Sequence, residues 1–223
     1  MKKNNFFSIY KKIAKIAVSA GFKNPSVPHT IGFSLFRKKS VWKLNFTKCP
    51  CDEHFVSYLM DHKIENKNIF HFGTGEHHYV GLQNFNLNLK NYIIGITPAF
   101  KEFQSYFKLS LELPLLASTY KVICADIYTL NKNDISFFDI ATFFHLCEFS
   151  IKENIPSHLL DDESLVELFL NRLNTNGLLA FYTQSAGWPS AQLIIDKLLT
   201  SQKIAYVEEF KTLKIYKDRK SVV

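Results

Sequence analysis

Four histidines are the side chains of this sequence with the clearest chemical potential. His71, His77 and His78 surround the Gly-Thr-Gly turn at residues 73–75, and His145 lies further along the chain. An imidazole titrates near neutral pH, so a histidine beside a bound ligand is suited to act as a general base. A structural interpretation is also open, in which His77 and His78 begin a helix and His71 packs against a neighbouring strand.

A second group of potential ligands is the segment Cys49-Pro-Cys51-Asp-Glu-His54. Its two thiols and its imidazole are groups that zinc accepts. The C-x-C-x-x-H pattern lacks a matched second pair of ligands, so we expect no metal and interpret the segment as a turn before a helix that starts at Asp52. The chain has four cysteines in all, and they are too scattered for a disulfide scaffold. This pattern indicates a reduced protein.

Strands that alternate with helices must position these side chains. Runs of apolar, β-branched and aromatic residues bounded by glycine, proline and asparagine predict the strands, and helical spacing predicts the helices. The predicted strands span residues 68–72, 92–97, 120–125, 137–143, 178–183, 204–210 and 212–217. The predicted helices span residues 52–62, 98–107, 161–173 and 189–200. Asn176-Gly177 is expected to end the third of these helices.

This alternation predicts an α/β fold, a Rossmann-like doubly wound sheet of seven strands. The last two strands are so close in sequence that they must form an antiparallel pair. In such sheets ligands bind beyond the carboxyl ends of the strands, next to the first strand. The glycine turn at residues 73–75 and the segment around His145 are therefore expected at the same edge.

Residues 1–51 are predicted to form an N-terminal appendage, a possible lid, before an α/β domain over residues 52–223. Helical spacing of apolar residues predicts a basic helix over Phe6–Ala20, which leaves weak contact with a membrane surface open. Residues Ile31–Phe46 are expected to form a hairpin over the mouth of the site. Four aromatic residues are either core residues or the lining of an acceptor pocket: Trp42, Phe46, Tyr58 and Trp188.

Composition excludes several classes of protein. With 223 residues, 47% hydrophobic residues, 8 glycines and 7 prolines, the chain is neither collagen-like nor largely disordered. Its net charge of +7 permits anionic partners, but the basic residues are spread along the chain and the base-reading motifs are missing. The start of the chain lacks the apolar region of a signal peptide, and no apolar run reaches about 18 residues, so we expect a cytoplasmic protein.

Four segments, in this order, resemble class I S-adenosylmethionine-dependent methyltransferases over residues 52–218. Ile69-Phe-His-Phe-Gly-Thr-Gly75 is similar to the family's first strand and glycine loop, which passes under the cofactor. Asp126 matches the acidic residue after the third strand that accepts a hydrogen bond from the adenine amino group. Phe138–Glu148 resembles the fourth strand and its loop, and Leu173–Tyr182 resembles the turn into the fifth strand.

The resemblance implies S-adenosylmethionine as cofactor and methyl transfer as reaction. His145 would act as general base on a small-molecule, sugar-like or lipid-like acceptor. Nucleic acid is an unlikely acceptor because neither an N-P-P-Y-like tetrad nor a nucleophilic Pro-Cys follows the fourth strand. The residues implied to contact the cofactor are His71, Gly73, Gly75, Thr97, Asp126, Ile127 and Phe144.

The chain departs from the family's pattern at two motifs. His71 stands where the family commonly has Asp or Glu, and His77 replaces the third glycine of the loop. Thr97 stands near the end of the second strand, where a carboxylate usually holds the ribose hydroxyls. These departures leave two other interpretations open, a non-catalytic member of the fold that binds a partner and, disfavoured by the same motifs, a nicotinamide-dependent enzyme. The sequence gives no signal for an oligomeric state.

Overall fold

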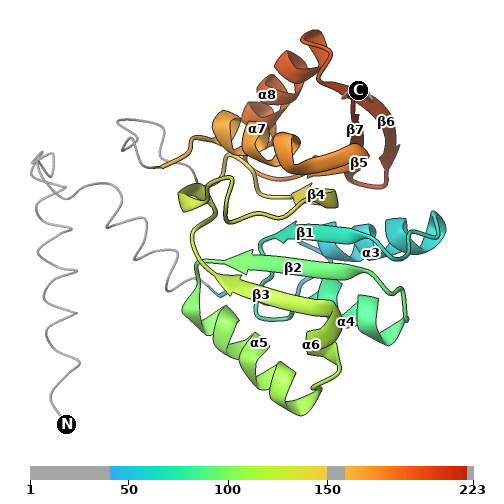
Figure 1. Ribbon diagram of the computed structural model, residues 1–223, viewed down its shortest axis with the longest axis vertical. Helices are drawn as coiled ribbons and strands as arrows, with labels where there is room; N and C mark the ends of the chain where they lie inside the picture. Colours follow the sequence, from blue (N-terminus) through green and yellow to red (C-terminus); the bar gives the residue numbers. More distant parts are fainter. Residues whose placement is uncertain (1–40, 150–158, 220–223) are drawn as a thin grey trace, which may run out of the picture. The chain divides into compact units, whose positions relative to one another are not determined.

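The computed structural model describes residues 41–149 and 159–219 and confirms the predicted α/β fold (Figure 1). Its seven-stranded sheet has the order β3-β2-β1-β4-β5-β7-β6. Strands β1 to β5 are parallel, and β7 runs antiparallel to both β5 and β6. The strands are β1 (Asn68–Phe72), β2 (Tyr92–Thr97), β3 (Tyr120–Cys124), β4 (Phe138–Phe143), β5 (Leu173–Tyr182), β6 (Ile204–Phe210) and β7 (Leu213–Asp218).

Helices cover both faces of this sheet. Alternate residues of each strand point to opposite faces, so Ile69 of β1 packs with α3 and α4, while Phe70 packs with α7. Both faces are apolar because helices cover each of them. The helices are α3 (Cys51–Asp61), α4 (Tyr79–Asn86), α5 (Phe100–Glu112), α6 (Leu116–Thr119), α7 (Asp162–Arg172) and α8 (Trp188–Thr200), with a short 3₁₀ helix, η1 (Ile127–Thr129).

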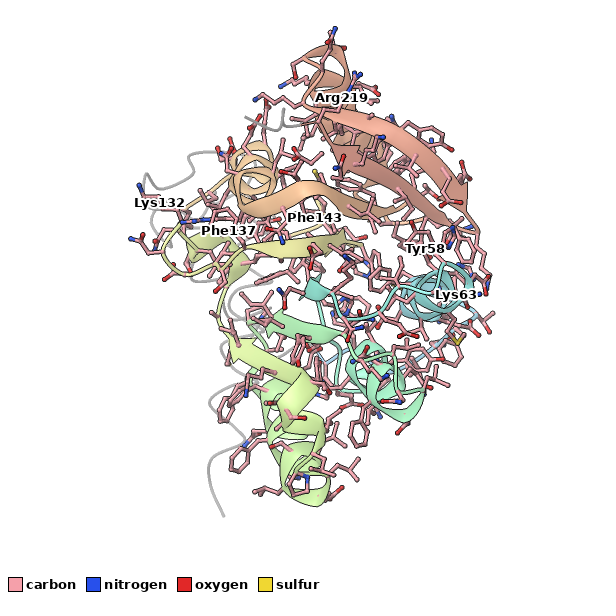
Figure 2. The ribbon with its side chains drawn as sticks, turned by 45° about the vertical axis from the view of Figure 1, so that its right-hand side comes forward. Tyr58, Lys63, Lys132, Phe137, Phe143 and Arg219 are labelled. Carbon is pink, nitrogen blue, oxygen red and sulfur yellow. The ribbon has the colours of Figure 1, made fainter. Side chains whose placement is uncertain are left out.

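The side chains between the layers form a dense core. Phe143 of β4 lies in the interior, while Lys63 and Lys132 lie at the surface (Figure 2). Within the described ranges, no helix combines the length and the apolar character needed to cross a membrane. The predicted helix over Phe6–Ala20 and most of the predicted hairpin over Ile31–Phe46 lie outside the described residues. Residues 41–46 form neither a helix nor a strand.

The predicted start of the fifth strand, residue 178, is wrong. Helix α7 ends at Arg172, and Leu173 already belongs to β5, where it pairs with Phe138 of β4 and is buried. Asn176 and Gly177 therefore do not end the helix. Asn176 has a φ of 61°, and a Cβ on Gly177 would lie 2.8 Å from the carbonyl oxygen of Asp139, next to the shift of register between β4 and β5. The pair shapes an irregularity of the strand.

Asp161 caps the N-terminus of α7. Its carboxylate accepts a hydrogen bond from the Ser164 backbone N–H at 2.6 Å, and this contact lowers the pKa of Asp161. We expect Asp161→Ala to lower the free energy of unfolding by about 1 kcal/mol at neutral pH, because one of the free amides of the helix loses its acceptor. Urea unfolding measures this difference.

The lowered pKa also fixes the pH dependence of this effect. The contribution of the ionised cap is present above the ordinary aspartate pKa of about 4, and it is lost as the pH falls through the lower pKa of the folded state. The stability difference between the wild type and Asp161→Ala should shrink over that range. Asp161→Ser, which keeps an acceptor without a charge, should restore part of the stability with no such pH dependence.

Candidate functional site

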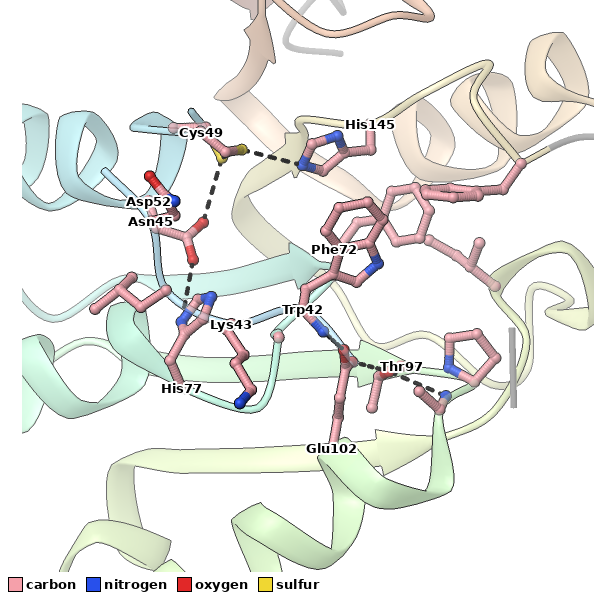
Figure 3. Close-up of a pocket in the computed structure, with 18 of the residues that line it drawn as sticks. Trp42, Lys43, Asn45, Cys49, Asp52, Phe72, His77, Thr97, Glu102 and His145 are labelled. Atoms are coloured by element: carbon pink, nitrogen blue, oxygen red, sulfur yellow. Dashed lines mark hydrogen bonds and ion pairs between the residues drawn. The ribbon is translucent and has the colours of Figure 1, made fainter. Parts of the chain in front are cut away.

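A cavity lies at the carboxyl ends of β1 to β4, where the fold places ligands (Figure 3). It brings together six of the eight residues singled out in the sequence: Gly73, Gly75, Thr97, Asp126, Ile127 and His145. The other two do not line it. His71 lies buried in β1, and Phe144 is buried beneath the site, where its ring contacts His71 and Phe55.

The turn after β1 needs glycine at residue 73. Gly73 has a φ of +83°, a backbone conformation that L side chains rarely adopt, and its N–H donates to the carbonyl oxygen of Ile96 at 3.2 Å. A Cβ at this position would have no described atom within 4 Å, although the residue lines the cavity. The backbone is therefore open to a ligand at this point.

The end of β2 carries a carboxylate that the sequence did not indicate. Glu102 of α5 is buried, and its Oε2 accepts a 2.6 Å hydrogen bond from the Thr97 hydroxyl. Its Oε1 accepts from the backbone N–H of Trp42 at 3.0 Å. Burial raises the pKa of Glu102, while these two hydrogen bonds oppose the shift. Thr97 and Glu102 together thus provide an acidic group at this strand end.

Asp126 follows β3 and caps η1. Its carboxylate accepts a hydrogen bond from the backbone N–H of Tyr128 at 3.1 Å, which holds the side chain at the edge of the cavity. Ile127, the next residue, is buried and also lines the cavity. The structure therefore places an acceptor and an apolar surface side by side after the third strand.

Cys49, His145 and Glu148 form a line of contacts, and the first two of these residues line the cavity. The Nε2 atom of His145 lies 3.6 Å from the Cys49 sulfur (Figure 3). Its Nδ1 lies 3.1 Å from Glu148 Oε1. The Cys51 sulfur lies 3.4 Å from that of Cys49. These contacts connect the turn before α3 with the loop after β4.

Electrostatics favour a charged pair in this line. The hydrogen bond with Cys51, helped by His145, lowers the pKa of Cys49 to about 4 against the effect of burial. Burial lowers the pKa of His145, but its hydrogen bonds with Cys49 and Glu148 outweigh burial and raise the pKa to about 10. At neutral pH the imidazole therefore holds its proton, and Cys49 carries the negative charge. A general base must be unprotonated, so the ring would first have to transfer this proton to another group. The general-base role of His145 therefore stays a prediction.

Asp52 lies between this line and the glycine turn. It is buried, and burial, helped by the charge of Cys49, raises its pKa to about 7. Its carboxylate oxygens lie 3.7 Å from His71 Nε2 and 3.8 Å from His77 Nδ1. Burial lowers the pKa of His71 to about 3, so this ring is neutral, and its Nδ1 is hydrogen-bonded to Thr142 of β4 at 2.9 Å. His71 thus packs against the fourth strand.

The remaining histidines near the turn have different surroundings. His78 is buried at the start of α4, where its Nδ1 contacts the Tyr120 hydroxyl and its Nε2 the Glu102 carbonyl oxygen, each at 2.9 Å. These contacts give it a structural role. His77 lines the cavity. His54 is hydrogen-bonded to the Thr212 hydroxyl at 2.7 Å, so the imidazole that completes the cysteine pair comes from His145.

The segment before α3 contributes five residues to the lining of the cavity: Trp42, Lys43, Leu44, Asn45 and Cys49. The backbone N–H of Trp42 bonds to Glu102, and its carbonyl oxygen accepts from the Glu76 N–H at 3.0 Å. The Trp42 ring stacks on His145 with their centroids 6.4 Å apart. Of the four aromatic residues considered for an acceptor pocket, Trp42 lines this cavity, whereas Phe46, Tyr58 and Trp188 do not.

Comparison with known proteins identifies the fold. No family model and no curated protein matches the sequence. The N-methyltransferase NodS from Bradyrhizobium japonicum WM9, solved with S-adenosyl-L-homocysteine, matches with a TM-score of 0.58 and 10% identity, over 86% of this chain and 100% of that one. Magnesium protoporphyrin IX methyltransferase from Synechocystis PCC 6803, solved with S-adenosylmethionine, matches with a TM-score of 0.57 and 12% identity, over 89% and 100% of the two chains.

A third similar structure shows what the fold leaves undetermined. The cyclase SpnF matches with a TM-score of 0.50 and 14% identity, over 77% of this chain and 61% of that one. This chain has the class I methyltransferase fold, and that fold hosts more than one reaction. Its activity must be argued from the cavity.

Proposed function

We propose that this chain, with its class I methyltransferase fold, is an S-adenosylmethionine-dependent methyltransferase acting on a small-molecule, sugar-like or lipid-like acceptor. One observation carries the proposal. The glycine turn at residues 73–75, the Thr97–Glu102 pair and Asp126-Ile127 come from three different strand ends and line a single cavity. This is where open α/β sheets bind ligands.

The chemistry of these residues fits the cofactor. The open backbone at Gly73 would accept its methionine part, and the Glu102 carboxylate, which has lone pairs beyond its two hydrogen bonds, would accept from the ribose hydroxyls. Asp126 would accept from the adenine amino group, with Ile127 against the ring. When bound, the cofactor supplies a methyl group on a positively charged sulfur.

The chain's own contribution to catalysis is positioning and proton movement. An acceptor atom held in line with the methyl group gains most of its rate from orientation. Trp42, Phe72 and Phe149 give the cavity apolar walls that would hold an acceptor and exclude water. His145, held by Cys49 and Glu148, is the group placed to receive or return the acceptor's proton.

The lining also supports a small acceptor over a nucleic acid. Lys43 is the sole Lys or Arg among the described residues that line the cavity, whereas nucleic-acid sites carry clustered basic residues.

We further infer a cytoplasmic location. No disulfide joins the cysteines of the described residues, although the sulfurs of Cys49 and Cys51 lie 3.4 Å apart, and a reducing compartment keeps cysteines in that state.

Calorimetric titration with S-adenosylmethionine and with S-adenosylhomocysteine tests the proposal. The wild type should bind both, and Asp126→Ala should weaken binding about 10- to 100-fold, because a hydrogen bond to a charged group contributes about 1.5–3 kcal/mol. Asp126→Asn keeps an acceptor for the cap of η1, so its affinity for the cofactor should lie between those of the wild type and Asp126→Ala. Asp134→Ala removes an exposed carboxylate outside the cavity and should bind like the wild type.

Each result has a separate meaning. Absence of binding by the wild type contradicts the proposed cofactor, and equal affinity of wild type and Asp126→Ala contradicts the placement of the adenine. Binding without methyl transfer to a panel of hydroxyl, amine and thiol acceptors would favour the non-catalytic alternative.

A further inference from the structure

We propose that Cys49, Cys51 and His145 form a zinc-binding site in the wall of the cavity. The two sulfurs and an imidazole nitrogen lie within 4.8 Å of one another. All three residues line the cavity, and Cys51 is buried. Two thiolates and an imidazole are the ligand set of zinc, whereas magnesium and calcium prefer oxygen ligands.

The spacing of the ligand atoms suits one tetrahedral ion. Zinc–sulfur bonds of about 2.3 Å and zinc–nitrogen bonds of about 2.0–2.1 Å imply a sulfur–sulfur edge of about 3.8 Å and a sulfur–nitrogen edge of about 3.6 Å. The sulfurs of Cys49 and Cys51 lie 3.4 Å apart, and Cys49 Sγ lies 3.6 Å from His145 Nε2. An ion could bind with small movements of side chains alone.

The surroundings of the three ligands also favour a cation. The Cys51 sulfur contacts two other acidic groups, the Cys49 sulfur and, at 3.7 Å, Asp52 Oδ1. The Nε2 atom of His71 lies 3.7 Å from the same oxygen of Asp52. This nitrogen is buried and makes no hydrogen bond to any described residue. The Cys49 and Cys51 sulfurs and the Asp52 carboxylate therefore lie close together. His71 Nε2, beside them, has no hydrogen-bond partner among the described residues. A bound cation would balance the acidic groups.

Glu148 supplies the support that metal-binding histidines usually have. It contacts His145 Nδ1 at 3.1 Å, which leaves Nε2 for the ion, and it accepts a hydrogen bond from the Ala186 N–H at 2.9 Å. A carboxylate in this position fixes the tautomer and orientation of the ligand ring. Glu148 is therefore a positioning residue of the proposed site.

Three protein ligands leave one coordination position of a tetrahedral ion for another group. Structural zinc sites are closed by four protein ligands, whereas sites that bind substrate or water keep three. Since all three ligands line the cavity that holds the glycine turn, the open position would face the cavity. The site is thus of the kind that binds a substrate heteroatom. Zinc binding itself does not depend on the proposed methyltransferase activity. In the zinc-bound protein, however, Nε2 of His145 would hold the ion, so the zinc would replace His145 in activating the acceptor atom.

Metal binding by the full-length protein tests this inference. The protein is purified with a non-thiol reductant, stripped with a chelator, and titrated with zinc and separately with cobalt. We expect one equivalent of zinc by elemental analysis, and a thiolate-to-cobalt charge-transfer band with the visible spectrum of a tetrahedral ion. Added imidazole should alter that visible spectrum by entering the open position. Lack of stoichiometric zinc, or a cobalt spectrum without the thiolate band, would overturn the site, and insensitivity to imidazole would overturn its open position.

Variants separate this site from the C-x-C-x-x-H pattern. Glu148→Gln should weaken zinc binding about 10- to 100-fold, and Cys49→Ser, Cys51→Ser and His145→Asn should weaken it further. The matched controls His54→Asn and Cys124→Ser should bind like the wild type, since His54 contacts Thr212 and Cys124 is an exposed thiol at the end of β3. Zinc binding that is lost in His54→Asn but kept in His145→Asn would overturn the assignment.

Discussion

Replacing Gly187 with alanine should lower the free energy of unfolding by about 3 kcal/mol. Gly187 caps α8 and is buried against the loop after β4. A Cβ at this residue would overlap the carbonyl oxygen of Leu146 and lie 3.0 Å from backbone atoms of Cys147 and Glu148. Backbone atoms cannot rotate away as a side chain does, so the helix or the loop must shift, and overpacking of this kind costs about 1–3 kcal/mol.

Thermal and urea unfolding measure this effect. For a domain of this size, about 3 kcal/mol corresponds to a fall in Tm of roughly 6–12 °C. Ser190→Ala, in the first turn of the same helix, is the control and should change stability by less than about 0.5 kcal/mol. If Gly187→Ala were as stable as the wild type, the loop over residues 146–148 could move to make room for the methyl group at little cost, which would contradict this prediction.

The same substitution connects stability with the site. The loop that Gly187 contacts carries His145 and Glu148, and the neighbouring Ala186 N–H donates to Glu148 Oε1. A shift of the loop would therefore move the imidazole relative to Cys49. We expect the zinc affinity of Gly187→Ala to fall even under conditions in which the protein is folded.

The sequence predicted most of the sheet because the parallel strands are short, apolar and sharply bounded. The limits of β1 and β2 agree residue for residue with those expected for 68–72 and 92–97. The start of β5 was missed for a physical reason. Asn176-Gly177 is a helix-ending signal in the sequence, but pairing of Leu173 with β4 starts the strand five residues before the predicted residue 178. Tertiary pairing outweighed the local signal.

Some residues of the candidate site could be predicted from the sequence, and others depend on tertiary contacts. Gly73, Thr97 and Asp126 could be placed from sequence because the carboxyl ends of parallel strands meet at one edge. Glu102 could not, because its role depends on contacts with Thr97 and with Trp42, which is 60 residues away. A search for an acidic residue in the first turn of the helix after β2 could have found it.

The cysteine cluster shows the limit of motif spacing. Cys49 and Cys51 are adjacent to His54 in sequence, yet their imidazole comes from His145, 96 residues from Cys49. The histidine that the structure places beside the cysteines is therefore not the one in the local pattern. What assembled the set was the topology, which places β4 beside β1 and directs the loop after β4 toward the turn before α3.

Gly73→Ala should weaken binding of S-adenosylmethionine about 10- to 100-fold while the protein remains folded. The added methyl group would project toward space that no described atom occupies within 4 Å and that borders the cavity. If the cofactor lies against this turn, the methyl group takes part of its volume, and overpacking of about 1–3 kcal/mol corresponds to such a loss of affinity. Calorimetric titration at equal protein concentration measures it.

Backbone strain must be separated from this steric effect. At a φ of +83°, alanine costs about 1–2 kcal/mol, so Gly73→Ala should also unfold a few degrees earlier than the wild type. Asn88→Ala is the matched control, because it places alanine at a positive φ of 52° outside the cavity. Both variants should lose stability, but only Gly73→Ala should lose affinity. Equal cofactor affinity of Gly73→Ala and the wild type would mean that the cofactor does not lie against the glycine turn.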